Sequence, residues 1–330
     1  MVGRKIGRVA SFSEIADYLN GSCIDSFERE GGDIRSLWTR ARSATLDLCK
    51  HFNLNWKWNR SSEEMELEIQ LLGHQPDMAT IHPFGRNSVV TNLERSVRAV
   101  YLRRLVAKPD QGKVFQPSSQ CPASNHFVRS GQFIRLCDWK FIHRARLDCL
   151  SLNGTFRFDY SSRYERCRRC GYDKETLPHV LNHCKIHCVS RARRHNAVLQ
   201  QIVKVIPESS VPIEINRMTG GNTTNLRPGL VVTNEVDRKV IFVDVAISFE
   251  NRFEALEDAR QEKMDKYQQL AYELRGKGYT VDLNVLVVGS LGTWDPANET
   301  TLQMLKIRGS SVVRMRKLIV SETIRCSRDI

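Results

Sequence analysis

The spacing of apolar residues predicts mostly helices before residue 207. In residues 34–52, Leu37, Ala41 and Leu48 recur at multiples of about one helical turn with arginines on other faces, which indicates a basic amphipathic helix. The same periodicity predicts further helices over residues 63–72, 89–106, 127–152 and 190–203. Residues 108–125 are rich in Pro, Gln, Ser and Gly and are expected to form a linker.

Two tryptophans lie between the first two predicted helices. Trp56 and Trp58 alternate with Lys57 in residues 53–62. Aromatic and basic residues mixed in this way can stack nucleic-acid bases, or they can simply fill a loop. The sequence leaves both interpretations open.

From residue 211 onward the pattern changes to that of strands. A short apolar segment at residues 230–233, a polar turn and a nearly continuous apolar run at residues 240–247 predict a hairpin whose second strand is covered on both faces. The pattern then predicts a helix, a strand and two helices at residues 252–275, 279–288, 297–307 and 311–323. This order is typical of an α/β module with a hairpin followed by a helical crossover, so the whole chain is expected to be α+β and multi-domain.

Two kinds of charged residue interrupt the apolar pattern of this module. Asp244 lies in the middle of the predicted buried strand, where an isolated carboxylate is costly. On the following helix, Lys263 falls near the centre of the apolar face and Lys266 toward its edge. A carboxylate and a lysine in one cleft are parts of metal-dependent phosphodiester hydrolysis, in which the acid holds Mg²⁺. A structural ion pair, or a lysine that reaches solvent, explains the pattern equally well.

Four candidate metal ligands follow the spacing Cys-x2-Cys-x8-His-x4-Cys. Cys167, Cys170, His179 and Cys184 can surround a zinc ion tetrahedrally, and because four protein ligands leave no open position, the site is expected to be structural. Free cysteines that bind nothing are the alternative. His183 is also an alternative to Cys184 as the fourth ligand.

The charge of the protein indicates a polyanionic partner. Its 330 residues carry a formal net charge of +13, with a pI near 9.4, which favours DNA or structured RNA over a membrane. A solvated basic surface without a partner is the alternative. The residues expected to contact nucleic acid are Arg144, Arg146, Arg168, Arg169, Arg191, Arg193 and Arg194.

The cysteines and the N-terminal residues indicate where the protein works. Of its ten cysteines, several such as Cys23, Cys49 and Cys326 are isolated, which suits a reducing compartment better than a disulfide framework. The N-terminal segment is basic without an apolar signal region, and no run of residues reaches transmembrane length. We therefore expect a soluble nuclear or cytoplasmic protein.

These residues together resemble the C-terminal half of the proteins of site-specific non-LTR retrotransposons. The resemblance rests on the Cys/His spacing, the preceding Trp-Lys-Phe-Ile-His-Arg-Ala-Arg-Leu of residues 139–147, the Arg-Pro-x-Leu of residues 227–230, the Val-Asp-Val around Asp244, and Lys263-x2-Lys266-Tyr. In that family a reverse transcriptase is followed by a linker, a CCHC zinc knuckle and a restriction-like endonuclease of the PD-(D/E)xK type. The resemblance implies, in order, a helical thumb-like region, a linker, a helical region with the knuckle and an endonuclease domain at residues 1–107, 108–125, 126–206 and 207–330.

The chain departs from the family pattern in two ways. It has no Phe/Tyr-x-Asp-Asp motif, so no reverse transcriptase activity is expected from it, and a separate polymerase is a conceivable partner. Gly229 stands where the family has its first metal-binding aspartate, whereas Asp244 matches the second acid and the two helix lysines match the displaced lysines of the family. Losing one of two carboxylates weakens the hold on Mg²⁺. Glu214 and Glu235 are nearby substitutes in the sequence, and neither is expected to be well placed.

Three hypotheses follow. The first is a retrotransposon-derived nucleic-acid-binding protein with a zinc knuckle and an endonuclease domain of weak or no activity. The second is an active Mg²⁺-dependent DNA endonuclease that nicks its target, with Asp244 as metal ligand and Lys263 as catalytic lysine. The third, a zinc-stabilised interaction protein without a nucleic-acid role, fits the positive charge least well.

Overall fold

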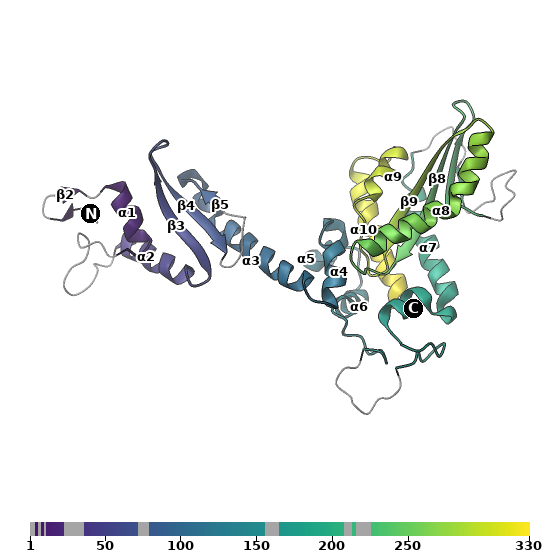
Figure 1. Cartoon of the computed structure of the whole chain (residues 1–330), viewed down its shortest axis with the longest axis horizontal. Coiled ribbons are helices and arrows are strands. Elements are labelled where there is room, and N and C mark those ends of the chain that lie inside the picture. The colour runs from purple at the N-terminus through teal and green to yellow at the C-terminus, as the bar shows by residue number, and fades with distance from the viewer. Residues whose placement is uncertain are drawn as a thin grey trace. The chain divides into compact units, whose positions relative to one another are not determined.

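The chain is mixed α and β and forms two compact units, residues Met1–Arg104 and Leu105–Ile330 (Figure 1). The computed structural model describes residues 4–5, 8–9, 11–22, 36–71, 79–155, 165–207, 213–215 and 226–330. None of the helices within these ranges combines the length and the apolar character that a membrane span requires.

The first unit combines helices with a small antiparallel sheet. Its elements are β1 (Arg4–Lys5), β2 (Arg8–Val9), α1 (Phe12–Leu19), α2 (Leu37–Leu48), β3 (Phe52–Asn59), β4 (Glu64–Leu71), β5 (Ala79–Ile81), η1 (Pro83–Ser88) and α3 (Val89–Val106). The first two helices both begin with a reciprocal capping box, built by Ser11 with Glu14 and by Ser36 with Thr39. The helices predicted over residues 34–52 and 89–106 are present as α2 and α3.

The prediction of a helix over residues 63–72 is wrong, because this segment is strand β4. Glu64, Glu66 and Glu68 alternate with apolar residues, and this period of two places Leu67 and Ile69 on one face. Both are buried in a cluster with residues of β3. The glutamates lie on the opposite face of the strand. In a helix the same apolar residues would not lie on one side, so the segment could not bury them together.

The two tryptophans of β3 are held by neighbouring side chains of the same unit. The indole N–H of Trp56 donates to Oγ1 of Thr45 at 3.0 Å. The ring of Trp58 stacks on that of Phe12, with 4.2 Å between the ring centroids. Both side chains therefore take part in packing this unit.

The second unit begins with four short helices, α4 (Gln111–Ser118), η2 (Pro122–Asn125), α5 (Phe127–Ser130) and α6 (Leu136–Arg146). Residues 108–125 are thus not an extended linker, since Val114 and Ala123 are buried in the main core. The small residues serve close packing: a Cβ on Gly112 would lie 2.0 Å from the carbonyl oxygen of Val106. The single helix predicted over residues 127–152 is interrupted at Gly131, whose φ of 63° is left-handed.

The rest of this unit is a four-stranded sheet with helices on both faces. Its elements are η3 (His179–His183), η4 (Lys185–His187), α7 (Cys188–Val203), β6 (Ile213–Ile215), β7 (Leu230–Asn234), β8 (Lys239–Ser248), α8 (Glu254–Gly276), β9 (Thr280–Gly289), α9 (Asn298–Met304) and α10 (Ser310–Arg328). The strand order is β6-β7-β8-β9, antiparallel except for the parallel pair β8 and β9. The hairpin and the helical crossover are present as predicted.

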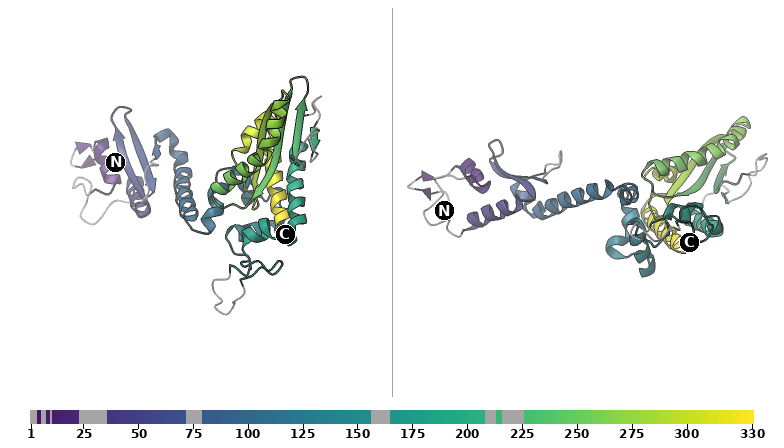
Figure 2. Two further views of the ribbon diagram at one scale, coloured as in Figure 1. Left: turned by 45° about the vertical axis from the view of Figure 1, so that its right-hand side comes forward. Right: turned by 60° about the horizontal axis from the view of Figure 1, so that its bottom comes forward.

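The two faces of the sheet have separate apolar cores. Alternate residues of β8, such as Val240 and Phe242, pack against α8, whereas Val243 and Val245 face the larger core with α7 and α10. Figure 2 shows α8 along one face of the sheet and α10 behind the other. A strand covered on both sides accounts for the nearly continuous apolar run in the sequence.

Strand β8 extends well beyond its partner β7. The last pair of the ladder is Leu230 with Val243, so residues 244–248 have no ladder partner on that edge within the described chain. Asn182 replaces one of the missing ladder hydrogen bonds, because its side-chain amide donates to the carbonyl oxygen of Ile247 at 2.8 Å. The open edge forms one wall of the cleft that is described next.

Candidate metal centre and the cleft beside it

The Cys/His cluster predicted from the sequence comes together in space. The ligand atoms of Cys167, Cys170, His179 and Cys184 all lie within 4.8 Å of one another. The closest contact joins Sγ of Cys170 to Nε2 of His179 at 3.2 Å. Three sulfurs and one imidazole nitrogen at such separations fit a metal ion such as zinc, and no other such group occurs in the described residues.

The backbone explains the unusual spacing of these ligands. The amide of Cys184 donates to the carbonyl oxygen of His179 at 2.7 Å, a bond over five residues that closes the single π-helical turn η3. This wide turn brings the fourth ligand back over the third. In the first half of the cluster, Gly171 has a left-handed φ of 73°, which reverses the chain after Cys170.

The electrostatics favour the metal-binding form at two of the four ligands, whereas burial raises the pKa of Cys184 and favours its thiol. A hydrogen bond from the backbone N–H of Tyr172 lowers the pKa of Cys170 and so favours the thiolate, which is the form that binds metals. Burial lowers the pKa of His179 and favours the neutral imidazole. His183, the alternative fourth ligand, does not belong to the cluster and instead lines the adjoining cleft.

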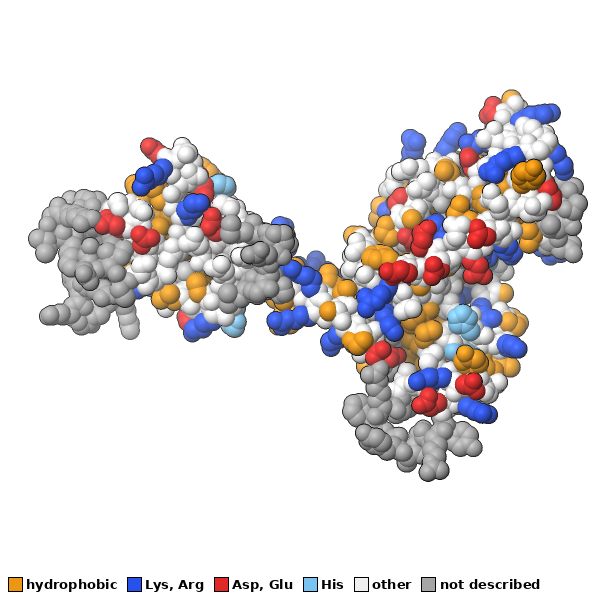
Figure 3. Space-filling view, viewed as in Figure 1, with side chains coloured by type: hydrophobic (Ala, Val, Ile, Leu, Met, Phe, Trp, Pro, Cys, Tyr) orange, Lys and Arg blue, Asp and Glu red, His pale blue; other side chains and the backbone are white. Residues whose placement is uncertain are grey.

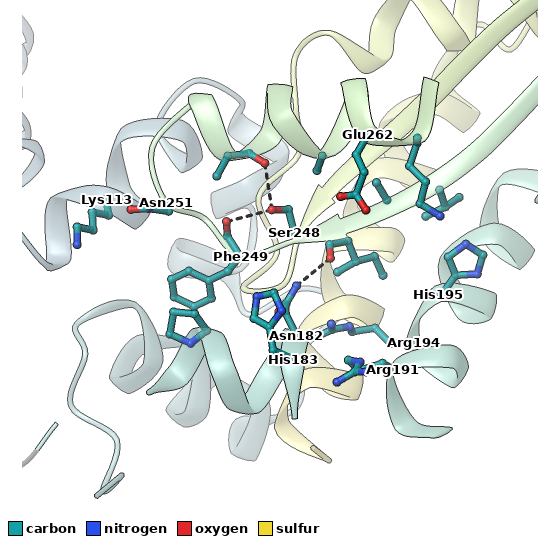
Figure 4. A pocket seen from close by; sticks show the side chains of 17 residues that line it. Lys113, Asn182, His183, Arg191, Arg194, His195, Ser248, Phe249, Asn251 and Glu262 are labelled. Carbon is teal, nitrogen blue, oxygen red and sulfur yellow. Dashed lines mark hydrogen bonds between the residues drawn. The ribbon is translucent and has the colours of Figure 1, made fainter. Parts of the chain in front are cut away.

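A cleft of about 710 Å³ separates the metal cluster and α7 from the C-terminal end of β8 and the first half of α8 (Figure 4). Six of its seventeen lining residues are or can become cationic, namely Lys113, His183, Arg191, Arg194, His195 and Lys263, and of these Arg194 is buried. Glu262 is the acidic residue of the lining. A concave surface lined by charges of one sign attracts ligands of the other sign.

Asp244 lies beside this cleft, between Lys263 and His195, which is cationic only when protonated. Nζ of Lys263 donates to its Oδ2 at 2.8 Å, so the sequence-based pairing of these residues is found in the structure. Nε2 of His195 lies 3.7 Å from Oδ1, which is an electrostatic contact and not a hydrogen bond. Burial alone raises the pKa of Asp244, but His195 and Lys263 outweigh it and hold this pKa well below its ordinary value.

Gly229 adjoins the same carboxylate. Continuing the register beyond Leu230 and Val243 places residue 229 opposite Asp244, and a Cβ built on Gly229 would lie 3.1 Å from Oδ1 of Asp244. Tyr267 closes the other side, since its hydroxyl donates to the carbonyl oxygen of Arg227 at 3.1 Å. Burial and the charge of Asp244 raise the pKa of this tyrosine.

The remaining candidates for the acid site do not gather around Asp244. Lys266 is exposed and its Nζ lies 5.1 Å from the centre of the Tyr267 ring. Glu235 is in the hairpin turn at the far end of β7, where it accepts a hydrogen bond from the hydroxyl of Tyr279. Glu214 is on β6, which β7 separates from β8. Asp244 is contacted by Lys263, His195 and Tyr267, and none of these candidates adds a second carboxylate. This is a poor fit for Mg²⁺, which prefers several oxygen ligands.

The seven arginines predicted to contact nucleic acid divide into two groups. Arg144, Arg168, Arg169 and Arg193 are exposed, and Arg191 is half-buried in the cleft wall. The prediction is wrong for Arg146 and Arg194, which are 4% and 2% exposed. Their guanidinium groups hold the core together and cannot reach a phosphate on the outside.

Both buried arginines are bound mainly by backbone carbonyls. Arg146 donates to the carbonyl oxygens of Ser124 and Leu291, each at 2.9 Å. Arg194 donates to the carbonyl oxygen of Leu181 and to Oγ of Ser327. Burial lowers the pKa of each to about 10.

The outer surface of α8 contrasts with the cleft. Figure 3 shows acidic side chains gathered over this helix, and its exposed acids outside the cleft lining are Glu254, Glu257, Asp258 and Asp265. Like charges repel, so this face of α8 is unfavourable for an anionic ligand.

His195 is the site residue that the sequence reasoning missed. It follows three arginines on α7 and was included in a generally basic helix. His195 comes close to Asp244 because α7 packs against the sheet. Nothing in its local sequence distinguishes it from an exposed histidine.

Comparison with known proteins covers only part of the chain. Residues 5–149 match the model of a family described as the T26G10.4 domain. No match was found among curated proteins. The matched segment includes the first unit and the helices up to α6, and it ends before the metal cluster and Asp244.

Proposed function

We propose that this chain is a retrotransposon-derived nucleic-acid-binding protein. In it a zinc-stabilised knuckle flanks an endonuclease-like module that binds a polynucleotide without cutting it. The observation that carries the proposal is the cationic cleft between the knuckle and the sheet, with Asp244 at its side. The family implied by the sequence motifs has the same order of modules.

The charge distribution supports nucleic acid as the ligand. Lys113, Arg191 and Lys263 reach the cleft from three different elements, and the net charge of the chain is +13. Arg169 and Arg193 are further exposed cations of the same unit, and Arg169 lines a second cavity beside the knuckle. Such contacts neutralise phosphates and release counterions, which is the main source of sequence-independent affinity.

Zinc is the metal that best suits the knuckle. Three thiolates and one imidazole are soft or borderline ligands that select zinc over Mg²⁺ or Ca²⁺. Four protein ligands complete a tetrahedron, so the ion would have a structural role. It would hold Cys167 and Cys184 together and thereby fix the loop that carries Arg168 and Arg169.

Binding without cleavage is the proposal for the module around Asp244. Gly229 supplies no carboxylate opposite this acid, and the two oxygens of Asp244 already face Lys263 and His195. The retrotransposon proteins that the sequence resembles have two acids here that hold a metal ion. This chain has Asp244 alone, and Asp244 is paired with Lys263. We derive no catalytic step from this arrangement.

The second candidate function is an active Mg²⁺-dependent DNA endonuclease. It is favoured by the distance of 2.8 Å between Lys263 and Asp244, which brings together a lysine and an acid beside the cleft. A single assay distinguishes the active endonuclease from the protein that only binds nucleic acid. Supercoiled plasmid with Mg²⁺ is nicked by an active enzyme and not by an Asp244→Ala variant, whereas a binding protein gives the same background with both.

The binding proposal is tested by titrating duplex DNA at several salt concentrations. We expect the logarithm of the association constant to fall steeply with the logarithm of salt concentration. Lys113→Gln should make this slope shallower by about 0.9, the contribution of one phosphate contact. Lys277→Gln is the matched control, because Lys277 is exposed at the other end of α8 and does not line the cleft. A flat salt response, or equal effects of both variants, would contradict the proposal.

A further inference from the structure

The knuckle presents an aromatic ring to solvent. Tyr172 follows Gly171 directly and is 58% exposed. Its ring lies parallel to the imidazole of the metal-site residue His179, with 4.5 Å between the ring centroids and 6° between the planes. One face of the tyrosine ring is therefore covered by the knuckle, and much of the remaining ring surface is open.

Tyr172 is also fixed by its backbone. Its carbonyl oxygen accepts a hydrogen bond from the amide of Cys167 at 2.8 Å, and its own N–H donates to the sulfur of Cys170. Both partners belong to the metal cluster. Because backbone and ring are both held, a ligand that stacks on the open face loses little further conformational entropy.

Cations and acids both lie near this ring. Arg168, Arg169 and Lys174 are exposed within four positions of Tyr172, but Arg168 forms an ion pair with Glu175 and Lys174 forms one with Glu165. Asp173 is a further nearby acid, so within the described residues Arg169 is the cation of this group that has no ion pair. Arg169 also lines a cavity beside the knuckle together with His187. A flat apolar surface beside a cation matches the two parts of a nucleotide, its base and its phosphate.

We infer that Tyr172 is a stacking platform for an unpaired base of single-stranded DNA or RNA. The inference rests on the proposed nucleic-acid-binding function and adds the class of substrate. In a duplex the base faces are stacked on one another and are inaccessible, so the platform selects single strands, ends or loops. The arginines beside it contact the phosphates of the same strand.

The test uses the full-length, metal-loaded protein and a 2-aminopurine-labelled oligonucleotide, as single-stranded DNA, as RNA of the same sequence and as duplex DNA. We expect Tyr172→Leu to weaken single-strand binding roughly tenfold, because stacking on one aromatic ring contributes at least that much. Tyr172→Phe should retain wild-type affinity. Tyr272→Leu is the matched control, since Tyr272 is 71% exposed on α8, away from the knuckle. Duplex binding should be the same for all variants.

Metal content is measured for each variant, because Tyr172 contacts a residue of the metal site. If Tyr172→Leu loses its metal, the wild-type protein is titrated instead with a matched oligonucleotide that carries abasic positions. A comparable loss of affinity for that oligonucleotide supports base stacking. Unchanged affinity overturns it.

The outcomes separate this inference from the proposed function. Stacking is wrong if Tyr172→Leu binds single strands as tightly as the wild type while salt-dependent duplex binding persists. The proposed function then stands, and the exposed ring serves another purpose, such as contact with a protein. If no nucleic acid binds at all, both proposals are wrong.

Discussion

At the scale of single residues, Gly229 determines how many carboxylates meet beside the cleft. The register of β7 and β8 places it opposite Asp244, and a Cβ there would lie 3.1 Å from the carboxylate oxygen of Asp244. Any side chain at this position therefore starts in contact with the acid. The residue itself is visible in the sequence, but its closeness to Asp244 is a property of the hairpin.

Introducing an acid at this position should create a cation site. In the absence of divalent metal, Gly229→Asp should destabilise the protein by roughly 1–3 kcal/mol, because two carboxylates repel each other. Mg²⁺ or Mn²⁺ should reverse this loss, which is measurable as a metal-dependent rise in the melting temperature. Gly229→Asn is the control of equal size without charge. The prediction is contradicted if both variants respond to metal in the same way.

The pairing of Asp244 predicts how stability depends on pH. Because the folded pKa of Asp244 lies below that of the unfolded chain, its pairing stabilises the protein above about pH 4, the ordinary pKa of an aspartate, and this contribution is lost as the pH falls further. The difference in unfolding free energy between the wild type and Asp244→Asn should therefore shrink between pH 6 and pH 3, taken as an approximate range around that pKa. Denaturant titrations across this range measure it. A difference that does not change with pH would show that the charge of Asp244 contributes nothing.

At the scale of elements, the knuckle depends on its cluster for order. It is a short segment, but Leu177 and Leu181 anchor it in the same core as Val198 and Leu199 of α7. A metal would tie together residues from Cys167 to Cys184 that few backbone hydrogen bonds connect directly. The knuckle and the first turn of α7 should therefore lose their ordered structure together when the metal is removed.

Removing the metal should unfold this element locally. A chelator should abolish hydrogen-exchange protection at the amides of η3 and η4 and leave that of β8 and β9 largely intact, because the sheet has its own cores. Cys184→Ser should have the same effect. Cys188→Ser is the control, since Cys188 is exposed and outside the cluster. Equal protection with and without chelator would mean that no metal stabilises the knuckle.

At the scale of the whole molecule, the chain consists of two units with separate cores. The sheet of β3, β4 and β5 packs within residues Met1–Arg104, whereas the metal cluster and the Asp244 site both belong to residues Leu105–Ile330. The two sites share one unit, so they should unfold in the same step as long as the metal is bound. Among the described residues, those that form the metal cluster and line the cleft all come from the second unit.

Denaturation of the full chain should accordingly show two transitions. Units with their own cores unfold independently unless a large apolar interface couples them. Chelation should lower the midpoint of one transition and leave the other unchanged. Fluorescence and circular dichroism followed across a urea titration would reveal this. A single transition that shifts as a whole on chelation would show that the units unfold together.

Much of the secondary structure followed from local pattern. Helices α2, α3, α7 and α8 and the order of hairpin, helix and strand were predicted because their periodicity and turn residues are local properties. Strand β4 was misassigned although its alternating glutamates carry a period of two. The segment at residues 108–125 was misassigned because glycine and proline also serve close packing, which composition does not distinguish from flexibility.

The sequence by itself indicated Cys167, Cys170 and His179 as ligands of the knuckle from their short spacing, and it left Cys184 or His183 as the fourth. The structure places Cys184 in the cluster. The sequence also indicated the Asp244 and Lys263 pair, because a charge on each of two apolar faces requires a partner. Only the tertiary structure decided which arginines are free: Arg193 is exposed and Arg194 is buried although they are neighbours on one helix. It also decided that His195 lies beside Asp244. Burial and contact depend on which elements pack together across the chain, and no local pattern encodes that.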